Sequence, residues 1–466
     1  MQTKYICRVT LVTLSFIFAF CYLFWTLDNW NNGFLISNYV PSIFIWVCFL
    51  IIFQITGFIL QKVSIYDFSV WYLILSYFFM FGLIFNEYMG FQTTLLWSPS
   101  NLYNNEELFH SYIFIIWILF CYSVGYLFFY SDGKVHYHSE VQNYQENEEK
   151  ILYNAGRILT GVGFISRVIT DSKTVLAVRA ANSYSAYSEA ASSGIIDDLG
   201  VLMLPGVFSL FYSDKLSRVI KRTIFWVMLF YLILIMILTG SRKIQVFSIL
   251  ALVLVYTQSL GITFSKKRVL VFLIVTVFLL NVLVVIRGHR FDLNTIGIYL
   301  FDSFSSLDFV KNILGEVFSE SGLTSLTVAS AVTVVPSSIP YEYGMTFLRT
   351  ILSIFPIGWL VGDFFDKASA TVVINKFLGL PVGSSFVEEL FWNFGYYGGV
   401  FWSFVLGIFS GWRLNFRAFQ TSKISKVIYF SVISQLLLLV RSSSIDVYRP
   451  IMYSLIMIFI FRRLKK

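Results

Sequence analysis

The sequence predicts an all-α polytopic membrane protein, and three observations support this prediction. Apolar residues make up 57% of the 466-residue chain, and charged residues only 13%. The apolar residues gather in runs of about 18–25, the length that a helix needs to cross a bilayer core. Lys and Arg concentrate in short segments between these runs, as in the loops of membrane proteins.

About twelve spans are predicted from these runs. Their approximate limits are 9–27, 42–60, 68–86, 109–130, 153–172, 195–212, 223–239, 244–262, 269–287, 395–412, 425–441 and 450–462. The stretch from Thr223 to Phe264 is apolar except at "TGSRK". As a single helix it would greatly overshoot the bilayer, so we expect the chain to turn back at Thr239–Lys243.

The basic residues predict the orientation of the spans. Both termini are placed in the cytoplasm, because this puts "SDKLSRVIKR", "SKKR", "RLNFRAFQTSKISK" and "RRLKK" inside. The chain then divides into spans 1–9 (1–287), a large outer loop before the tenth span (288–394) and spans 10–12 (395–466). Prolines break the apolar pieces of the loop, so we interpret them as amphipathic helices on the membrane surface.

Several arginines contradict the inside bias and cluster at the outer ends of spans. They are Arg242 in "TGSRK", Arg287 and Arg290 in "VIRGHRFD", and Arg441 and Arg449 around "RSSSIDVYRP". Any one of them could simply pair with lipid headgroups. As a set they favour a different interpretation, because arginine forks match phosphate oxygens in bidentate fashion. A lipid diphosphate is the outer ligand that this set predicts.

Two places offer a general base near the outer surface. His289 lies between two arginines, which favour its neutral form. Glu388 and Glu389 are adjacent in "GSSFVEELFWNFGYYGG". On a helix they point about 100° apart, so only one of them can face a given site. The other is expected to be solvated or paired with an arginine.

Other features of the sequence limit the chemistry. There is no Asp-x-Asp pair, no glycine-rich phosphate loop and no cluster of metal ligands. We therefore expect no metal, no cofactor and no soluble nucleotide-activated donor, and the activated group must arrive on a membrane carrier. The net charge of +8 follows from the topology and does not indicate nucleic acid. Tyr341, Tyr343 and Trp392 are flat side chains that could stack on sugars, although such aromatics also serve as membrane-interface anchors.

The order of three motifs resembles a known family. "LTGSRK", "SESGLTSLTVASAVTVVPSSIPYEYGMTFL" and "GSSFVEELFWNFGYYGG", within 220–412, resemble the O-antigen polymerases (Wzy type) of bacterial surface polysaccharide assembly. The most specific positions are Ser385, Glu389, Asn393, Phe394, Gly395 and Gly398. The related O-antigen ligases carry a His-Asn pair ahead of a G-x-x-G, where this chain has Ser384 and Ser385. The missing histidine argues against ligase activity.

The resemblance implies a GT-C-like glycosyltransferase of the bacterial inner membrane, with its active site facing the periplasm. Its substrates would be glycans linked to undecaprenyl diphosphate, and a regulator of chain length is a candidate partner protein. Glu389 matches the family pattern and becomes the first candidate for the base, with His289 second. Asn393 joins the aromatic residues as a candidate for sugar binding.

Two other functions fit a polytopic protein with outer basic residues. One is a flippase or transporter of lipid-linked oligosaccharide, and the other is an O-antigen ligase or surface-sugar acyltransferase. Transport sites lie near the membrane midplane, whereas the polar groups here gather beneath the outer loop. The polymerase is therefore the function that the sequence favours.

Overall fold

The computed structural model describes residues 2–32, 39–91, 102–130, 141–181, 195–240, 243–262, 309–355, 362–377, 379 and 383–463. The chain divides into two compact units. The first unit comprises residues 1–133, 314–418 and 439–446, and the second comprises 134–313, 419–438 and 447–466. Every regular element in the described ranges is a helix, so the predicted all-α class is confirmed.

The first unit contains the elements that build the candidate site. Its helices are α1 (Gln2–Asn32), α2 (Tyr39–Gln61), α3 (Phe68–Met89), α4 (Asn105–Phe129), α14 (Ser325–Val334), α15 (Met345–Leu352), η3 (Gly362–Phe364), η4 (Asp366–Ala368), η5 (Thr371–Asn375) and α17 (Phe386–Arg413). Four helices cross a boundary between the units: α13 (Phe309–Gly322), η6 (Phe416–Phe419), η7 (Leu437–Arg441) and α19 (Ser444–Arg463).

One buried apolar cluster of the second unit consists of Ala155, Leu159 and Leu202. The helices of this unit are α5 (Val141–Ala181), α7 (Ile195–Gly200), α8 (Met203–Tyr212), α9 (Arg218–Thr239), α10 (Lys243–Ser259) and α18 (Lys423–Leu436). Phe225 near the start of α9 stacks on Tyr256 near the end of α10, with ring centroids 4.2 Å apart. The two helices are therefore antiparallel, which confirms the predicted reversal at "TGSRK".

Seven helical segments among the described residues are long and apolar enough to cross a membrane. They are Ile6–Asn29, Tyr39–Gln61, Phe68–Met89, Asn105–Phe129, Arg218–Thr239, Lys311–Val334 and Lys423–Arg441. Six of them overlap predicted spans, so a polytopic membrane protein is confirmed, while the total of twelve and the orientation stay predictions. The segment Lys311–Val334 falls in the region interpreted as surface helices, and its mean hydropathy of 1.2 is the lowest of the seven.

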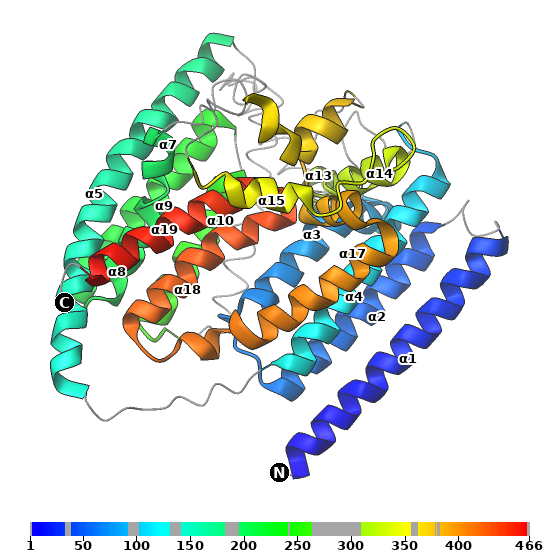
Figure 1. Cartoon of the computed structure of the whole chain (residues 1–466), viewed down its shortest axis with the longest axis horizontal. Coiled ribbons are helices and arrows are strands. Elements are labelled where there is room, and N and C mark those ends of the chain that lie inside the picture. The colour runs from blue at the N-terminus through cyan, green and yellow to red at the C-terminus, as the bar shows by residue number, and fades with distance from the viewer. Residues whose placement is uncertain are drawn as a thin grey trace. The chain divides into compact units, whose positions relative to one another are not determined.

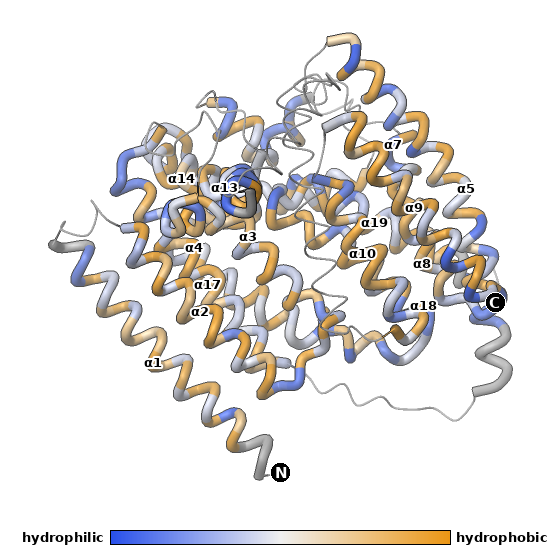
Figure 2. Tube along the Cα trace, turned by 180° about the vertical axis from the view of Figure 1, so that it is seen from behind, coloured by the Kyte–Doolittle hydropathy of each residue, from blue (hydrophilic) through white to orange (hydrophobic). Residues whose placement is uncertain are grey.

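Apolar side chains also cover much of the outside of these helices. Figure 2 shows mainly hydrophobic residues along α1, where Phe16 and Phe20 are each 72% exposed. Only 22% of the most apolar part of α1 is buried against the rest of the protein. A lipid environment explains this exposure, because in water such a surface would drive association.

α4 and α17 form the tightest helix pair of the first unit and lie side by side (Figure 1). Ser403 Oγ donates to the carbonyl oxygen of Ile118 at 2.7 Å, and the pairing continues toward the ends of both helices at Gly407 and Gly411. Residue numbers rise together along the two helices, so they run parallel. Small residues at the contact allow this close approach of the two backbones.

We expect Gly407→Ala to destabilise the protein. A Cβ atom at this position would lie 2.1 Å from the carbonyl oxygen of Tyr122, so α4 and α17 would have to separate. Overpacking of this kind costs about 1–3 kcal/mol, and we expect a lower unfolding temperature in detergent. Gly161→Ala is the matched control, because nothing lies within 4 Å of a Cβ there. Equal unfolding temperatures for the two variants would contradict the close contact.

Candidate active site

The site begins where the motif "GSSFVEELFWNF" starts a helix. Ser385 is the N-cap of α17, and its Oγ accepts from the backbone N–H of Glu388 at 3.1 Å. In turn, Oε2 of Glu388 accepts a hydrogen bond from the backbone N–H of Ser385 at 3.1 Å. This reciprocal pair is a capping box, which satisfies two backbone donors at the helix start.

Glu388 is thereby fully buried, which corrects the expectation of a solvated or arginine-paired neighbour. The helix start turns its carboxyl back toward the chain and away from solvent. Burial, partly offset by the hydrogen bond from Ser385 N, raises the pKa of Glu388 well above its usual range. Its Oε1 has no hydrogen-bond partner in the part of the chain that the structure describes. These observations favour a neutral carboxyl group whose role is to cap the helix.

Glu389 points to a different set of partners and is also fully buried. Its Oε1 accepts from Thr346 Oγ1 at 2.8 Å and from Ser444 Oγ at 2.6 Å. Its Oε2 accepts from the backbone N–H of Ser444 at 2.7 Å. The two adjacent glutamates therefore have separate surroundings, as the helical geometry predicted. Three donors from two distant segments hold the Glu389 carboxyl in one orientation.

The protonation of Glu389 follows from the balance between burial and these donors. Burial raises its pKa, and the hydrogen bonds from Ser444 and Thr346 lower it, with a result of about 7. The carboxyl lies in the first turns of α17, ahead of the predicted span that begins at 395. A carboxyl group with a pKa near neutrality can take and return a proton, which is the property required of a general base.

Asn393 connects the helix to the segment that supplies Thr346. Its Nδ2 donates to Thr346 Oγ1 and to the carbonyl oxygen of Glu389, both at 2.8 Å. Its Oδ1 accepts from the backbone N–H of Gly344 at 2.9 Å. Because Thr346 Oγ1 accepts from Asn393, its single proton is directed to Glu389. The amide therefore fixes the direction of the hydrogen bond that reaches the carboxylate.

The helix is interrupted just after Asn393. Gly395 has φ 63° and ψ −161°, and a Cβ atom there would lie 3.0 Å from the Tyr341 hydroxyl. The preceding carbonyl groups find other partners, because Glu342 N donates to Trp392 O and Tyr343 N donates to Asn393 O. The break separates the short segment that carries the glutamates from the long apolar helix that follows.

The turn from Arg441 to Ser444 closes the site from the other side. Ser443 donates to Ser384 Oγ through its backbone N–H at 3.0 Å and through its Oγ at 2.8 Å. Ser444 Oγ lies 3.0 Å from Thr350 Oγ1 in α15. Ser444 uses its only hydroxyl proton on Glu389, so Thr350 is the donor of this second bond. Ser384, which the resemblance aligned with the ligase histidine, thus anchors the turn.

Two of the five predicted diphosphate ligands, Arg441 and Arg449, lie among the described residues, and their environments differ. The guanidinium of Arg441 lies over the ring of Phe79, 5.6 Å from its centroid, three residues before Ser444. Arg449 belongs to the second unit, where its Nη2 pairs with Asp198 Oδ2 at 2.5 Å. Arg242, Arg287, Arg290 and the alternative base His289 lie outside the described residues.

The predicted sugar-binding residues divide into exposed and buried side chains. Tyr343 is 78% exposed and its ring lies 5.9 Å from that of Tyr341. Trp392 and Asn393 are both fully buried. In this conformation Trp392 packs inside the protein and Asn393 links two segments, so only the two tyrosines present a surface that a sugar could reach.

Sequence reasoning missed the two hydroxyl donors to the carboxylate, Thr346 and Ser444. Serine and threonine are common in loops, and neither residue stands near Glu389 in the chain. The one available signal was the run of three serines directly after Arg441. A second feature that the sequence did not reveal is the ion pair of Arg349. Its Nη1 pairs with Glu342 Oε2 at 2.6 Å and supports the segment before Thr346.

The seven candidate spans make this a polytopic α-helical membrane protein, and the buried carboxyl groups at the start of α17 give it an enzyme-like polar site. The family model for "O-antigen polysaccharide polymerase Wzy" matches residues 6–465, nearly the whole chain. The chain belongs to this family, and its role is that of an O-antigen polymerase, a glycosyltransferase-type enzyme that acts on lipid-linked polysaccharide. Neither the comparison with curated proteins nor that with solved structures finds a match.

Proposed function

We propose that the protein joins oligosaccharide repeat units linked to undecaprenyl diphosphate, at the periplasmic face of the inner membrane and without a metal ion. Glu389 is the general base of this reaction. The observation that supports this role best is a buried carboxyl group with a pKa of about 7, oriented by three hydrogen-bond donors.

The hydrogen bonds leave one oxygen of Glu389 able to receive a proton. Each carboxylate oxygen has two acceptor positions. Oε1 uses both, for Thr346 and Ser444, whereas the one donor to Oε2 among the described residues is the backbone N–H of Ser444. The remaining position on Oε2 is the one that we assign to the hydroxyl of the acceptor sugar. Because Glu389 has no exposed surface, a covering segment must move before the acceptor can reach it.

In the proposed step the acceptor hydroxyl oxygen attacks the anomeric carbon of the donor glycan. A new glycosidic bond forms, the bond from this carbon to the diphosphate oxygen breaks, and the diphosphate leaves with the electron pair. Glu389 takes the hydroxyl proton. Fixed cations stabilise the charge that develops on the leaving group, because preorganised electrostatics lower the barrier most effectively.

Arg441 is the cation that we assign first to the diphosphate, because it belongs to the same turn as the Ser444 donors. Arg242, Arg287 and Arg290 remain further candidates from the sequence. Arg449 pairs with Asp198, so it would have to exchange this carboxylate for a phosphate group. Tyr341 and Tyr343 are candidates for stacking against the growing chain.

Purified protein in lipid nanodiscs, supplied with lipid-linked repeat units and nothing else, tests this proposal. We expect a ladder of polymer lengths on a gel. Arg441→Ala should lose the ladder, and Arg441→Lys should restore only part of it, because an ammonium group cannot bind a diphosphate in bidentate fashion. Arg218→Ala, an exposed arginine at the start of α9, is the control. Unchanged single repeats with the wild-type protein would refute the proposed reaction.

A further inference from the structure

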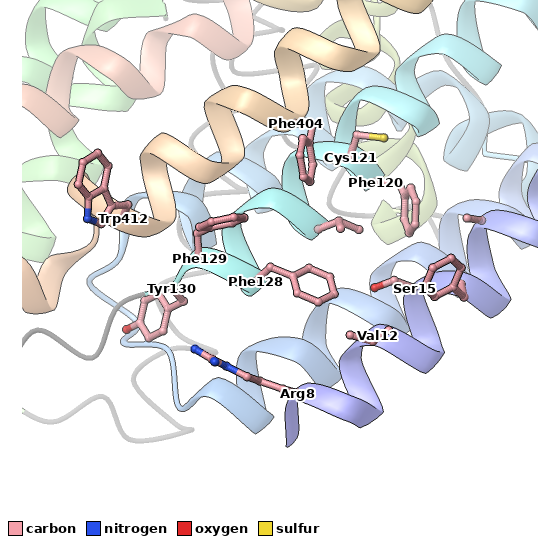
Figure 3. Close-up of a pocket in the computed structure, with 13 residues that line it drawn as sticks. Arg8, Val12, Ser15, Phe120, Cys121, Phe128, Phe129, Tyr130, Phe404 and Trp412 are labelled. Carbon is pink, nitrogen blue, oxygen red and sulfur yellow. The ribbon is translucent and has the colours of Figure 1, made fainter. Parts of the chain in front are cut away.

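A groove with a volume of about 950 Å³ lies between α1, α4 and α17 of the first unit (Figure 3). This volume falls in the range of roughly 300–1,000 Å³ that is typical of ligand sites. Most of its wall is aromatic or aliphatic, with contributions from Val12, Phe16, Ala19, Phe120, Phe128 and Phe404. Ser15 also lines the groove, but its hydroxyl donates to the carbonyl oxygen of Leu11 at 2.7 Å. The wall is therefore suited to a hydrocarbon chain.

One end of the groove is basic. Arg8, Tyr130 and Trp412 gather there, and Figure 3 shows the guanidinium of Arg8 directed toward Tyr130. Two further arginines lie close to the faces of these aromatic rings. Arg413 lies 3.9 Å from the ring centroid of Trp412, and Arg417 lies 5.2 Å from that of Tyr130.

Asp67, an acidic residue near this end of the groove, does not cancel the positive charge of the arginines. Asp67 is fully buried, and its Oδ2 accepts from the backbone N–H of Phe416 at 3.0 Å. Burial raises the pKa of Asp67 to about 7, and the positive charge of Arg417 lowers it. Arg417 itself donates through Nη2 to the carbonyl oxygen of Lys62 at 2.7 Å. Arg8 is exposed and lines the groove itself. This end of the groove is therefore an anion site that lies next to the apolar wall.

This anion site is far from the candidate active site. Tyr396, just after the break that follows Glu389, donates to the carbonyl oxygen of His110 in α4. Tyr130 follows the end of this unbroken helix, so α4 rises roughly 30 Å between the two levels. That distance equals the thickness of a bilayer core. A diphosphate that reacts at Glu389 cannot also contact Arg8, so the occupant of the groove is not the reacting headgroup.

We propose that the groove binds an anionic phospholipid of the leaflet opposite the active site, with its phosphate at Arg8 and one acyl chain along α1 and α4. Such a lipid has an apolar chain and an anionic headgroup. The apolar wall of the groove suits the chain, and the guanidinium of Arg8 with the rings of Tyr130 and Trp412 suits a headgroup at the membrane surface. The sparse packing of α1 leaves the groove wall accessible from the membrane, since only 22% of its apolar part is buried. The choice of leaflet rests on the proposed active site at Glu389, whereas binding of the lipid at Arg8 does not.

Native mass spectrometry of the full chain, released from detergent and titrated with single lipids, tests the proposal. Phosphatidylglycerol and phosphatidylethanolamine with identical acyl chains are compared. We expect tighter binding of phosphatidylglycerol, and a loss of about fivefold in its affinity with Arg8→Gln, the effect of one basic residue near an anionic surface. Ala19→Trp should abolish binding of this lipid, because the indole fills the groove while Arg8 remains.

Arg222→Gln is the matched control, because Arg222 is an exposed arginine of α9 and does not line the groove. It should bind phosphatidylglycerol as the wild type does. Equal affinity for the two lipids, or equal losses with Arg8→Gln and Arg222→Gln, would overturn the proposal. The proposal would also be overturned if a membrane-spanning partner protein copurified with this chain in a 1:1 ratio and its helix kept lipid out of the groove.

Discussion

We expect Glu389→Gln to lower polymer formation by at least about 100-fold, while Glu388→Gln retains most of the activity. General bases contribute roughly 10²–10⁴-fold to the rates of enzymes. A glutamine at 389 keeps the size of the side chain but cannot take the hydroxyl proton. The N–H groups of the new amide would also face Thr346 and Ser444, which are themselves donors to the carboxylate, so these hydrogen bonds would be weakened.

The neighbouring variant is a matched control for this result. Glu388 acts as the second half of a capping box, in which glutamine serves as well as glutamate. Glu388→Gln therefore preserves the helix start and changes neither the charge nor the contacts of Glu389. Both variants are compared with the wild type for the polymer ladder and for unfolding temperature. Equal losses of activity, at unchanged unfolding temperatures, would contradict the separate roles of the two glutamates.

The second large effect is the dependence of the rate on pH. A general base works in its deprotonated form, and the pKa of Glu389 is about 7. Polymerisation should therefore be near its maximum at pH 8 and fall about tenfold for each unit below 7. Initial rates with purified protein and saturating lipid-linked repeats, between pH 5 and 8.5, measure this profile.

A variant of Ser444 tests whether the pH profile reports the titration of Glu389. The hydrogen bond of the Ser444 hydroxyl lowers the pKa of the carboxyl, so Ser444→Ala should raise that pKa and move the midpoint to higher pH. At pH 6 this variant should be slower than the wild type, and at high pH the rates should converge. Ser337→Ala, an exposed serine outside the site, should leave the midpoint unchanged. A midpoint that stays constant in Ser444→Ala would assign the titration to another group.

Much of the architecture could be predicted from hydropathy alone, because crossing a bilayer requires long apolar runs. The segment Lys311–Val334 was harder to predict as a candidate span. Lys311, Glu316 and Glu320 interrupt its first half, and "SLTVASAVTVV" by itself is too short to cross a bilayer. The division into two units was not predictable, since each unit combines segments from distant parts of the chain.

The site could be predicted only in part. The pair of glutamates stood out because charged residues are costly within an apolar chain, and their angular separation followed from helix geometry. Glu388 completes the capping box because Ser385 is the N-cap. The sequence alone does not show this role of Ser385, since the start of the helix must be known first. The contact with Ser444 depends on tertiary packing, because 55 residues separate it from Glu389.

The hydrogen bonds to Glu389 also have a consequence for biosynthesis. The carboxyl group, the amide of Asn393 and the hydroxyl of Thr346 are all synthesised well before Ser444. Until the last part of the chain has been made and inserted, Glu389 lacks two of its three donors. A nascent or C-terminally truncated chain therefore has an incompletely oriented Glu389 carboxyl group. With Glu389 as the proposed base, we expect a chain that ends before Ser444 to be inactive.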